Sequence, residues 1–186
     1  MDQAIEDHTA LTASAAEGFA GRAGPLLLIA VTVFSIDQVT KAFVRSRLAL
    51  GEVWPTDFNL IRFSHVENRG AAFGILQGAG PLLVVTTTVA IALIALTMFR
   101  GGSYPRSHLY ALALVLGGAV GNLADRIARG SVTDFIDPTH YPSFNLADSA
   151  IVIGVGALLL MTLFERDEPD PASEPATEQS SDSVAK

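Results

Sequence analysis

The chain of 186 residues contains no cysteine. This absence excludes disulfide bonds, a cysteine nucleophile and any metal site built from thiolates. It also means that the chain itself cannot carry a lipid on cysteine. The four histidines lie far apart, without the spacing of zinc ligands. A serine hydrolase is weakly supported, because the chain has no Gly-x-Ser-x-Gly motif. We therefore expect a protein that works without a metal, a thiol or another cofactor.

Positive charge is also in short supply. Lysine and arginine number 12 against 19 aspartates and glutamates, and the net charge is −7. Most of the excess acid lies in residues 1–24 and 165–186, whereas residues 25–164 are nearly neutral. The basic surface that nucleic-acid binding requires is absent, so nucleic acid is excluded as a partner. Residues 165–186 contain too little apolar sequence to fold, and we predict disordered acidic termini at both ends of the chain. The acidic first 24 residues also differ from a cleavable signal peptide, which begins with positive charge.

Apolar sequence, by contrast, is abundant. Hydrophobic residues make up 49% of the chain, and its mean hydropathy is +0.39. Four apolar segments stand out, at residues 25 to about 44, 81–99, about 108–124 and 149–164. A helix needs roughly 20 residues to cross the hydrocarbon core of a bilayer. The second segment is therefore long enough alone, and the others need their polar ends. Pro25 and Pro81 fit the first turn of a helix, where a missing N–H costs no hydrogen bond.

The region between the first two segments has a different character. Around residues 58–66, apolar and polar side chains partly alternate, as they do in a half-buried strand. We therefore predict a small β element over about residues 45–67, resting on the membrane surface. The predicted fold class is an all-α membrane protein with four transmembrane helices over residues 25–164. A disordered lead-in (1–24) precedes this domain, and a disordered acidic tail (165–186) follows it.

The polar residues within this apolar domain gather at one face of the membrane. Consecutive spans alternate in direction across the membrane. One face of the membrane therefore holds the end of the first span, the start of the second, the end of the third and the start of the fourth. The polar motifs at those four places are Asp37-Gln38-Val39-Thr40-Lys41, Asn68-Arg69-Gly70, Gly121-Asn122-Leu123-Ala124-Asp125-Arg126 and Phe144-Asn145-Leu146-Ala147-Asp148-Ser149. Ionisable side chains at membrane depth are costly and usually mark function. The convergence of these motifs predicts a functional site.

Carboxylates are the reactive groups that remain for this site. The candidates are Asp37, Asp125, Asp134 and Asp148. Two carboxylates held close together share a proton, so one can act as a base on water while the other polarises the scissile carbonyl. Such a pair titrates as a unit. Asp125 lies at the end of the third span, and Asp134 lies in a loop beside the site. Position alone nominates either of them as the partner of Asp148.

Five motifs, in this order, resemble bacterial signal peptidase II, the lipoprotein signal peptidase. They are Asp-Gln-x-Thr-Lys at 37–41, Asn-Arg-Gly-Ala-Ala-Phe at 68–73, Gly-Asn-x-x-Asp-Arg at 121–126, Val-Thr-Asp-Phe at 132–135 and Phe-Asn-Leu-Ala-Asp-Ser at 144–149. The resemblance extends from about Pro25 to Phe164. It implies a membrane aspartyl endopeptidase that removes signal peptides from prolipoproteins, cutting before a cysteine that carries diacylglyceryl. We expect a monomer whose partners are these prolipoproteins and membrane lipids.

The resemblance assigns the catalytic role to Asp134 and Asp148. The positions that match its other motifs are Asp37, Lys41, Asn68, Gly70, Asn122, Arg126 and Asn145. We expect these residues to support the catalytic pair or to bind substrate. Asp125 is assigned a structural role, with its neighbour Arg126 as a salt-bridge partner. The resemblance implies no metal ion.

Several of these residues have a second interpretation. Asp148 could simply cap the fourth helix, because acids are favoured near a helix N-terminus, although Asn145 already offers a cap. Asp37 and Lys41, four residues apart, could form an intrahelical ion pair or could orient substrate, and both alternatives stay open. Asparagine both donates and accepts hydrogen bonds, so we expect the asparagines to hold the carboxylates and the substrate backbone. Four glycines are interpreted as sites of close helix packing, namely Gly70, Gly117, Gly118 and Gly121.

The resemblance implies that both termini lie in the cytoplasm, with the active site and the β element at the extracytoplasmic face. Counting basic residues gives seven on the face of the site and five on the other, which favours the opposite orientation. Several of the seven belong to the site, so the resemblance decides this prediction. Two other functions remain, a four-helix proton-linked transporter and a non-catalytic scaffold. Transporters tend to contain inverted repeats and a site near the midplane. No repeat is visible here and the polar motifs lie at one end, which favours the peptidase.

Overall fold

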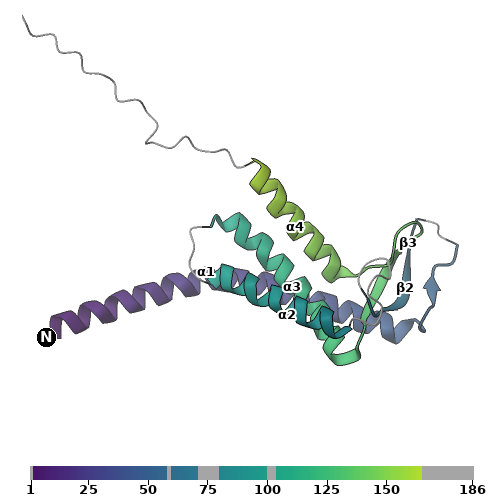
Figure 1. Ribbon diagram of the computed structural model, residues 1–186, viewed down its shortest axis with the longest axis horizontal. Coiled ribbons are helices and arrows are strands. Elements are labelled where there is room, and N and C mark those ends of the chain that lie inside the picture. Colours follow the sequence, from purple (N-terminus) through teal and green to yellow (C-terminus); the bar gives the residue numbers. More distant parts are fainter. Residues whose placement is uncertain (1, 58–59, 71–79, 100–103, 165–186) are drawn as a thin grey trace, which may run out of the picture.

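The computed structural model describes residues 2–57, 60–70, 80–99 and 104–164. In chain order its elements are α1 (Asp2–Arg47), β1 (Val53–Trp54), β2 (Ile61–Asn68), α2 (Gly80–Phe99), α3 (Arg106–Arg129), β3 (Val132–Pro138) and α4 (Leu146–Phe164). The helices pack around α3, and the strands lie together at the end of the molecule opposite the N-terminus (Figure 1). Residues 71–73 of the second motif and the acidic tail 165–186 lie outside the described residues.

Within the described residues, four helices are long and apolar enough to cross a membrane. They are Ala23–Arg47, Gly80–Met98, Arg106–Arg129 and Leu146–Phe164, of 25, 19, 24 and 19 residues. Each corresponds to one of the apolar segments, so the prediction of a four-helix, multi-pass membrane fold is confirmed. Three of the spans contain residues of the polar motifs, and the third and fourth reach beyond their apolar segments to do so. A helix satisfies its own backbone groups, so only the side chains of these motifs require polar partners within the protein.

The first helix begins much earlier than the sequence predicts. Residues 1–24 are expected to be disordered, with a helix starting at Pro25. The structure differs, because α1 runs from Asp2 to Arg47 with Pro25 inside it. The segment before Pro25 is rich in alanine, the strongest helix former. Acidic residues in a segment do not prevent local helix formation when most of its other residues favour a helix. A proline inside a helix removes one backbone hydrogen bond, and here the helix continues on both sides of it.

The central helix of the bundle is α3. It packs against α1, α2 and α4 and is the most buried of the four spans. A β-carbon at Gly117 would lie 2.6 Å from the carbonyl oxygen of Ala30 in α1, and one at Gly118 would clash with the carbonyl of Ala147 in α4. Because no side chain fits at either position, these two glycines are confirmed as sites of close helix packing. The buried apolar cluster comprises Leu26, Ala30, Met98, Ala113 and Leu116.

The strands form one antiparallel sheet in the order β1-β2-β3. β1 and β2 lie where the sequence predicts a β element, except that β2 continues to Asn68. β3 is missing from that prediction, which places Asp134 in a loop; in the structure Asp134 lies within β3, opposite Val66 of β2. A strand of seven residues is stabilised by its neighbours rather than by its own propensity. The neighbour of β3 is far away in the sequence, so local patterns do not reveal it.

A glycine connects the central helix to this sheet. Gly130 follows α3 as its C-cap, and its φ of 73° lies in the left-handed region. The Gly130 N–H donates to the carbonyl oxygen of Arg126 at 2.9 Å. Glycine adopts this conformation without a steric penalty. The chain therefore turns from α3 directly into β3. As a result, Asp125 near the end of α3 and Asp134 in β3 lie at the same end of the bundle.

Candidate active site

The site is built on a lysine buried at the end of α1. Lys41 has no exposed surface, and its Nζ contacts three oxygens. These are Oδ2 of Asp37 at 2.9 Å, Oδ2 of Asp125 at 3.2 Å and Oδ1 of Asn122 at 2.9 Å. A lysine ammonium has three N–H donors, so each donor has one acceptor. Of the two alternatives for Asp37 and Lys41, the intrahelical ion pair is therefore observed, and it is joined to two residues of α3.

Asp37 connects this ion pair to the start of α4. Its side chain is fully buried. Its Oδ1 accepts a hydrogen bond from the backbone N–H of Ala147 at 3.0 Å, and its Oδ2 accepts one from Nε2 of Gln38 at 3.1 Å. A β-carbon at Gly121 would lie 2.7 Å from Oδ2 of Asp37. Gly121 is thus a packing glycine of a particular kind, since it makes room for a buried carboxylate rather than for a helix backbone.

Asp125 takes a structural position, but its partner is not the predicted one. The sequence analysis pairs Asp125 with Arg126. In the structure its oxygens lie 3.2 Å from Nζ of Lys41 and 3.7 Å from Nη1 of Arg45, and Oδ2 accepts the backbone N–H of Thr133 at 3.3 Å. Adjacent residues on a helix point about 100° apart, so Asp125 and Arg126 face different neighbours. The bond to Thr133 ties α3 to the strand residue immediately before Asp134.

Asp148 and Asn145 cap the start of α4 reciprocally. Oδ1 of Asn145 accepts the backbone N–H of Asp148 at 2.9 Å, and Oδ2 of Asp148 accepts the backbone N–H of Asn145 at 3.3 Å. This arrangement is a capping box. The other oxygen of Asp148, Oδ1, accepts Nδ2 of Asn122 at 2.7 Å. Asp148 can therefore cap α4 and also belong to the site, because each role uses a different oxygen of its carboxylate.

Asp134 is held by two asparagines from different elements. Its side chain is buried, with 2% of the residue exposed. Oδ1 accepts Nδ2 of Asn145 at 2.8 Å, and Oδ2 accepts Nδ2 of Asn68, at the end of β2, at 2.9 Å. Burial, reinforced by the nearby charge of Asp148, raises the pKa of Asp134 to about 6, although both hydrogen bonds oppose the shift.

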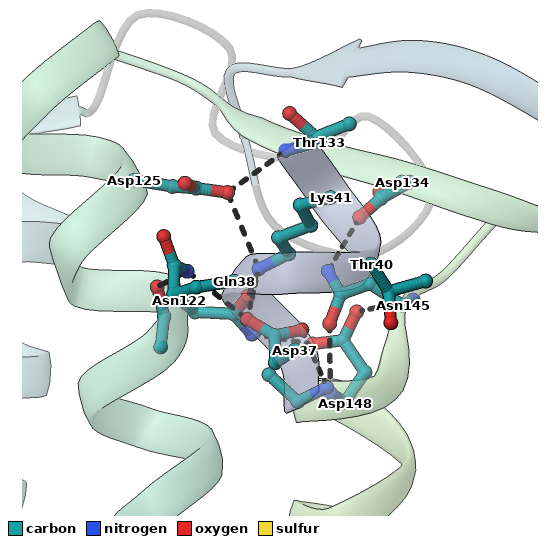
Figure 2. A network of polar contacts seen from close by, with 12 residues as sticks. Asp37, Gln38, Thr40, Lys41, Asn122, Asp125, Thr133, Asp134, Asn145 and Asp148 are labelled. Carbon is teal, nitrogen blue, oxygen red and sulfur yellow. Dashed lines mark hydrogen bonds and ion pairs between the residues drawn. The ribbon is translucent and has the colours of Figure 1, made fainter. Parts of the chain in front are cut away.

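The three asparagines are oriented by bonds to their own oxygens, and two of them, Asn122 and Asn145, are labelled in Figure 2. Oδ1 of Asn68 accepts the backbone N–H of Gly70 at 3.0 Å, Oδ1 of Asn122 accepts Lys41, and Oδ1 of Asn145 accepts the N–H of Asp148. An asparagine whose oxygen is occupied by a donor turns its NH₂ group the other way. All three NH₂ groups donate to Asp134 or Asp148. The prediction that the asparagines hold these carboxylates is confirmed; their predicted contact with substrate stays a prediction.

The structure thus joins the predicted site residues in one polar network. Arg126 is half-buried and interacts electrostatically with Asp148, Asp134 and Asp125. Gly70 enters the network through its N–H rather than as a helix-packing site. Arg45 and Thr133 are not among the predicted site residues, although Nη1 of Arg45 donates to Oγ1 of Thr133 at 2.9 Å. Arg45 could have been found, because it follows Lys41 by four residues on the same helix face. Over the described ranges of the chain, no histidine, aspartate and glutamate side chains form a group that could hold a metal ion.

Comparisons with known proteins identify relatives over most of the chain. The sequence model of the family described as signal peptidase (SPase) II matches residues 29–164. Lipoprotein signal peptidases of Syntrophotalea carbinolica and Brevibacillus brevis are each 45% identical to the chain. Those matches cover 73% and 72% of this chain, and 88% and 91% of the relatives. A solved bacterial membrane enzyme aligns with a TM-score of 0.74 at 30% identity, covering 80% of this chain and 93% of the other.

Proposed function

This chain belongs to the signal peptidase II family, and on that premise we propose that Asp134 and Asp148 are its catalytic pair. The protein is a multi-pass membrane peptidase that processes lipoprotein precursors. Within that function, the proposal names the two residues that carry out the cleavage, the lipid-bearing substrate and the face of the membrane where cleavage occurs. The transporter alternative has no support among the relatives, which are named as peptidases.

The observation that carries the proposal is that one residue, Asn145, holds both carboxylates. Its Nδ2 donates to Asp134, and its backbone N–H donates to Asp148. The charge of Asp148 also contributes to the raised pKa of Asp134, which places the two carboxylates within electrostatic reach of each other. Asp37 and Asp125 differ from this pair, because each of them forms an ion pair with the buried Lys41.

We propose that the pair cleaves the peptide bond in two steps with one shared proton. In the first step the ionised carboxylate takes a proton from water, and the water oxygen attacks the peptide carbonyl carbon. The protonated carboxyl group gives its proton to the carbonyl oxygen, so a neutral diol forms. In the second step the base returns its proton to the peptide nitrogen, and the C–N bond breaks. The diol then loses a proton to the other carboxylate, which restores the starting state.

The location of this pair suits a substrate anchored by lipid. Asp134 lies in β3 and Asp148 in the first turn of α4, and the sheet lies beside this end of α4 (Figure 1). We propose that a peptide leaving the bilayer meets the headgroup region at this end of the molecule. A diacylglyceryl-cysteine would occupy that depth, with its acyl chains in the bilayer and the peptide bond before it at the carboxylates. We propose that this is the extracytoplasmic face, with both termini in the cytoplasm. We also propose that the protein acts as a monomer surrounded by membrane lipids, because the whole network comes from one chain.

The charge count that opposes this orientation loses weight when each base is considered with its partner. Lys41 and Arg45 contact Asp125, Arg62 lies 2.9 Å from Asp137, and Arg69 lies 3.7 Å from Glu67. The positive-inside rule concerns lysines and arginines in the loops beside the spans. Lys41 and Arg45 lie inside the span Ala23–Arg47, where they belong to the polar network. The proposed orientation therefore rests on the family and not on the count of seven against five.

The proposal is tested by cleavage of a synthetic precursor with the purified protein in detergent. The precursor carries diacylglyceryl-cysteine, and a matched precursor carries unmodified cysteine. Asp134→Asn and Asp148→Asn should each lower kcat at least about 100-fold, because general acid–base catalysis contributes that much or more. Asp137→Asn is the matched control, since Asp137 lies on the same strand but pairs with Arg62. It should retain activity. Full activity of either pair variant, or equal cleavage of both precursors, would contradict the proposal.

A further inference from the structure

Lys41 has a position that neither an ordinary ion pair nor a substrate contact explains. It is fully buried and contacts three acceptors. Each acceptor makes a further bond toward the catalytic pair. Asn122 donates to Asp148, Asp37 accepts the N–H of Ala147 next to Asp148, and Asp125 accepts the N–H of Thr133 next to Asp134. Three separate paths therefore run from one ammonium group to the two carboxylates.

From this geometry we infer that Lys41 is a positioning residue that sets the placement of Asp148 and Asp134 relative to each other. It acts through Asn122 directly on one carboxylate and through backbone groups on both. This inference rests on the proposed catalytic roles of Asp134 and Asp148. It goes further by assigning the control of their geometry to a residue that has no access to substrate.

The path through Asn122 is the most direct. With the ammonium of Lys41 on Oδ1, the amide of Asn122 has a single orientation, in which Nδ2 faces Oδ1 of Asp148 at 2.7 Å. Without Lys41 the amide loses the donor that fixes it and can turn its oxygen toward Asp148. An amide oxygen facing a carboxylate is repulsive, so Asp148 would move away from its place in the pair. Loss of Lys41 should therefore impair the chemical step more than the binding of substrate.

The charge of Lys41 provides a second and separate readout. The charged groups that face Asp134 are Asp148 from α4, Lys41 from α1 and Arg126 from α3. Lys41 lowers the pKa of Asp134, opposing the effects of burial and of Asp148. Removing the ammonium should therefore raise the pKa of Asp134 further. The pair would keep its shared proton to a higher pH, and the alkaline limb of its pH–rate profile would move in the same direction.

The experiment compares Lys41→Met and Lys41→Gln with the wild-type enzyme on the diacylglyceryl precursor, at several pH values. We expect kcat to fall roughly 10- to 100-fold, the loss that misplaced reacting groups of about 1 Å can cause, with KM little changed. The alkaline limb of log(kcat/KM) should move to higher pH, because the ammonium that lowers the pKa of Asp134 is gone. Arg47→Met is the matched control, because it removes an exposed cation from the same helix, outside the network. It should leave both quantities unchanged.

A double-mutant cycle with Asn122→Ala tests the direct path. If Lys41 acts through Asn122, the loss of kcat in the double variant should be much smaller than the product of the two single losses. A purely structural role would lower the yield of folded enzyme but leave the pH limb in place, and that result would overturn the inference. Failure of both Lys41 variants to fold would also overturn it, since Gln retains donors for two acceptors. None of these outcomes involves the wild-type enzyme. Its own cleavage of the diacylglyceryl precursor tests the proposed function separately.

Discussion

The raised pKa of Asp134 should appear as a pH dependence of folding stability that Asp134→Asn abolishes. The pKa of this carboxyl is about 6 in the folded protein against 3.8 for an ordinary aspartate. Between these two values the folded state holds a proton that the unfolded state has lost, so the free energy of unfolding decreases as pH rises. The decrease is complete above about pH 6 to 7. A difference of roughly two pKa units corresponds to about 3 kcal/mol.

Asparagine resembles the protonated carboxyl in shape and charge, so Asp134→Asn removes this penalty. Relative to the wild type, the variant should gain about 3 kcal/mol of stability between pH 4 and pH 8. For a domain of this size, this gain should increase the Tm of the variant relative to that of the wild type by roughly 6 to 12 °C. Groups that titrate identically in both proteins cancel in that difference. The prediction therefore concerns Asp134 and its coupling to Asp148.

The measurement is thermal unfolding in detergent at pH 4, 5, 6, 7 and 8. Thiol-reactive dyes are unsuitable because the chain contains no cysteine, so the single tryptophan, Trp54, and circular dichroism provide the signals. Asp137→Asn, three residues along β3, controls for the loss of an acid at this end of the molecule. A Tm difference between Asp134→Asn and wild type that stays constant from pH 4 to pH 8 would refute the reasoning. So would a variant that loses stability relative to wild type at high pH.

Two further predictions concern packing and orientation. Gly121→Ala should lower both Tm and kcat, because the added β-carbon would lie 2.7 Å from Oδ2 of Asp37. Gly156→Ala should raise Tm slightly or leave it unchanged, because a β-carbon there meets open space. Equal effects of the two substitutions on Tm would contradict the packing argument. Orientation is tested by introducing one cysteine at a time into this cysteine-free chain. Thr56→Cys, between β1 and β2, should react with a membrane-impermeant maleimide on intact cells, and Ser107→Cys should react only after permeabilisation. The reverse pattern would place the site in the cytoplasm.

The sequence was sufficient for those features that depend on short segments or on chain direction. Apolar runs of about 20 residues predict membrane spans wherever they occur, and the four spans follow the four runs. Alternating direction then places Asp37, Asn122 and Asp148 at one end, and the structure joins them there. Helix starts were predicted less well, because a proline such as Pro25 favours a first turn without excluding a helix interior.

The division of labour among the aspartates depended on the tertiary structure. Position in the sequence nominates Asp125 as readily as Asp134, and only the family motif separates them. In the fold, Asp125 faces Lys41 and Arg45, while Asp134 faces Asn68 and Asn145. Burial is similar for both, so the difference lies in the partners. Burial raises the pKa of Asp134 to about 6, because the hydrogen bonds from its amide partners offset that effect only in part, whereas Asp125 lies beside two cations.

By itself, then, the sequence determined that this is a four-span membrane protein with its ionisable residues at one end. The tertiary structure determined which of those residues pair and how each amide is turned. The reason is that hydropathy and chain direction act along the chain, whereas hydrogen-bond partners are chosen in space. Lys41 and Asn122 are 81 residues apart, and Asn68 and Asp134 are 66 apart. Only the packing of α3 against α1 and the pairing of β3 with β2 bring these groups into contact.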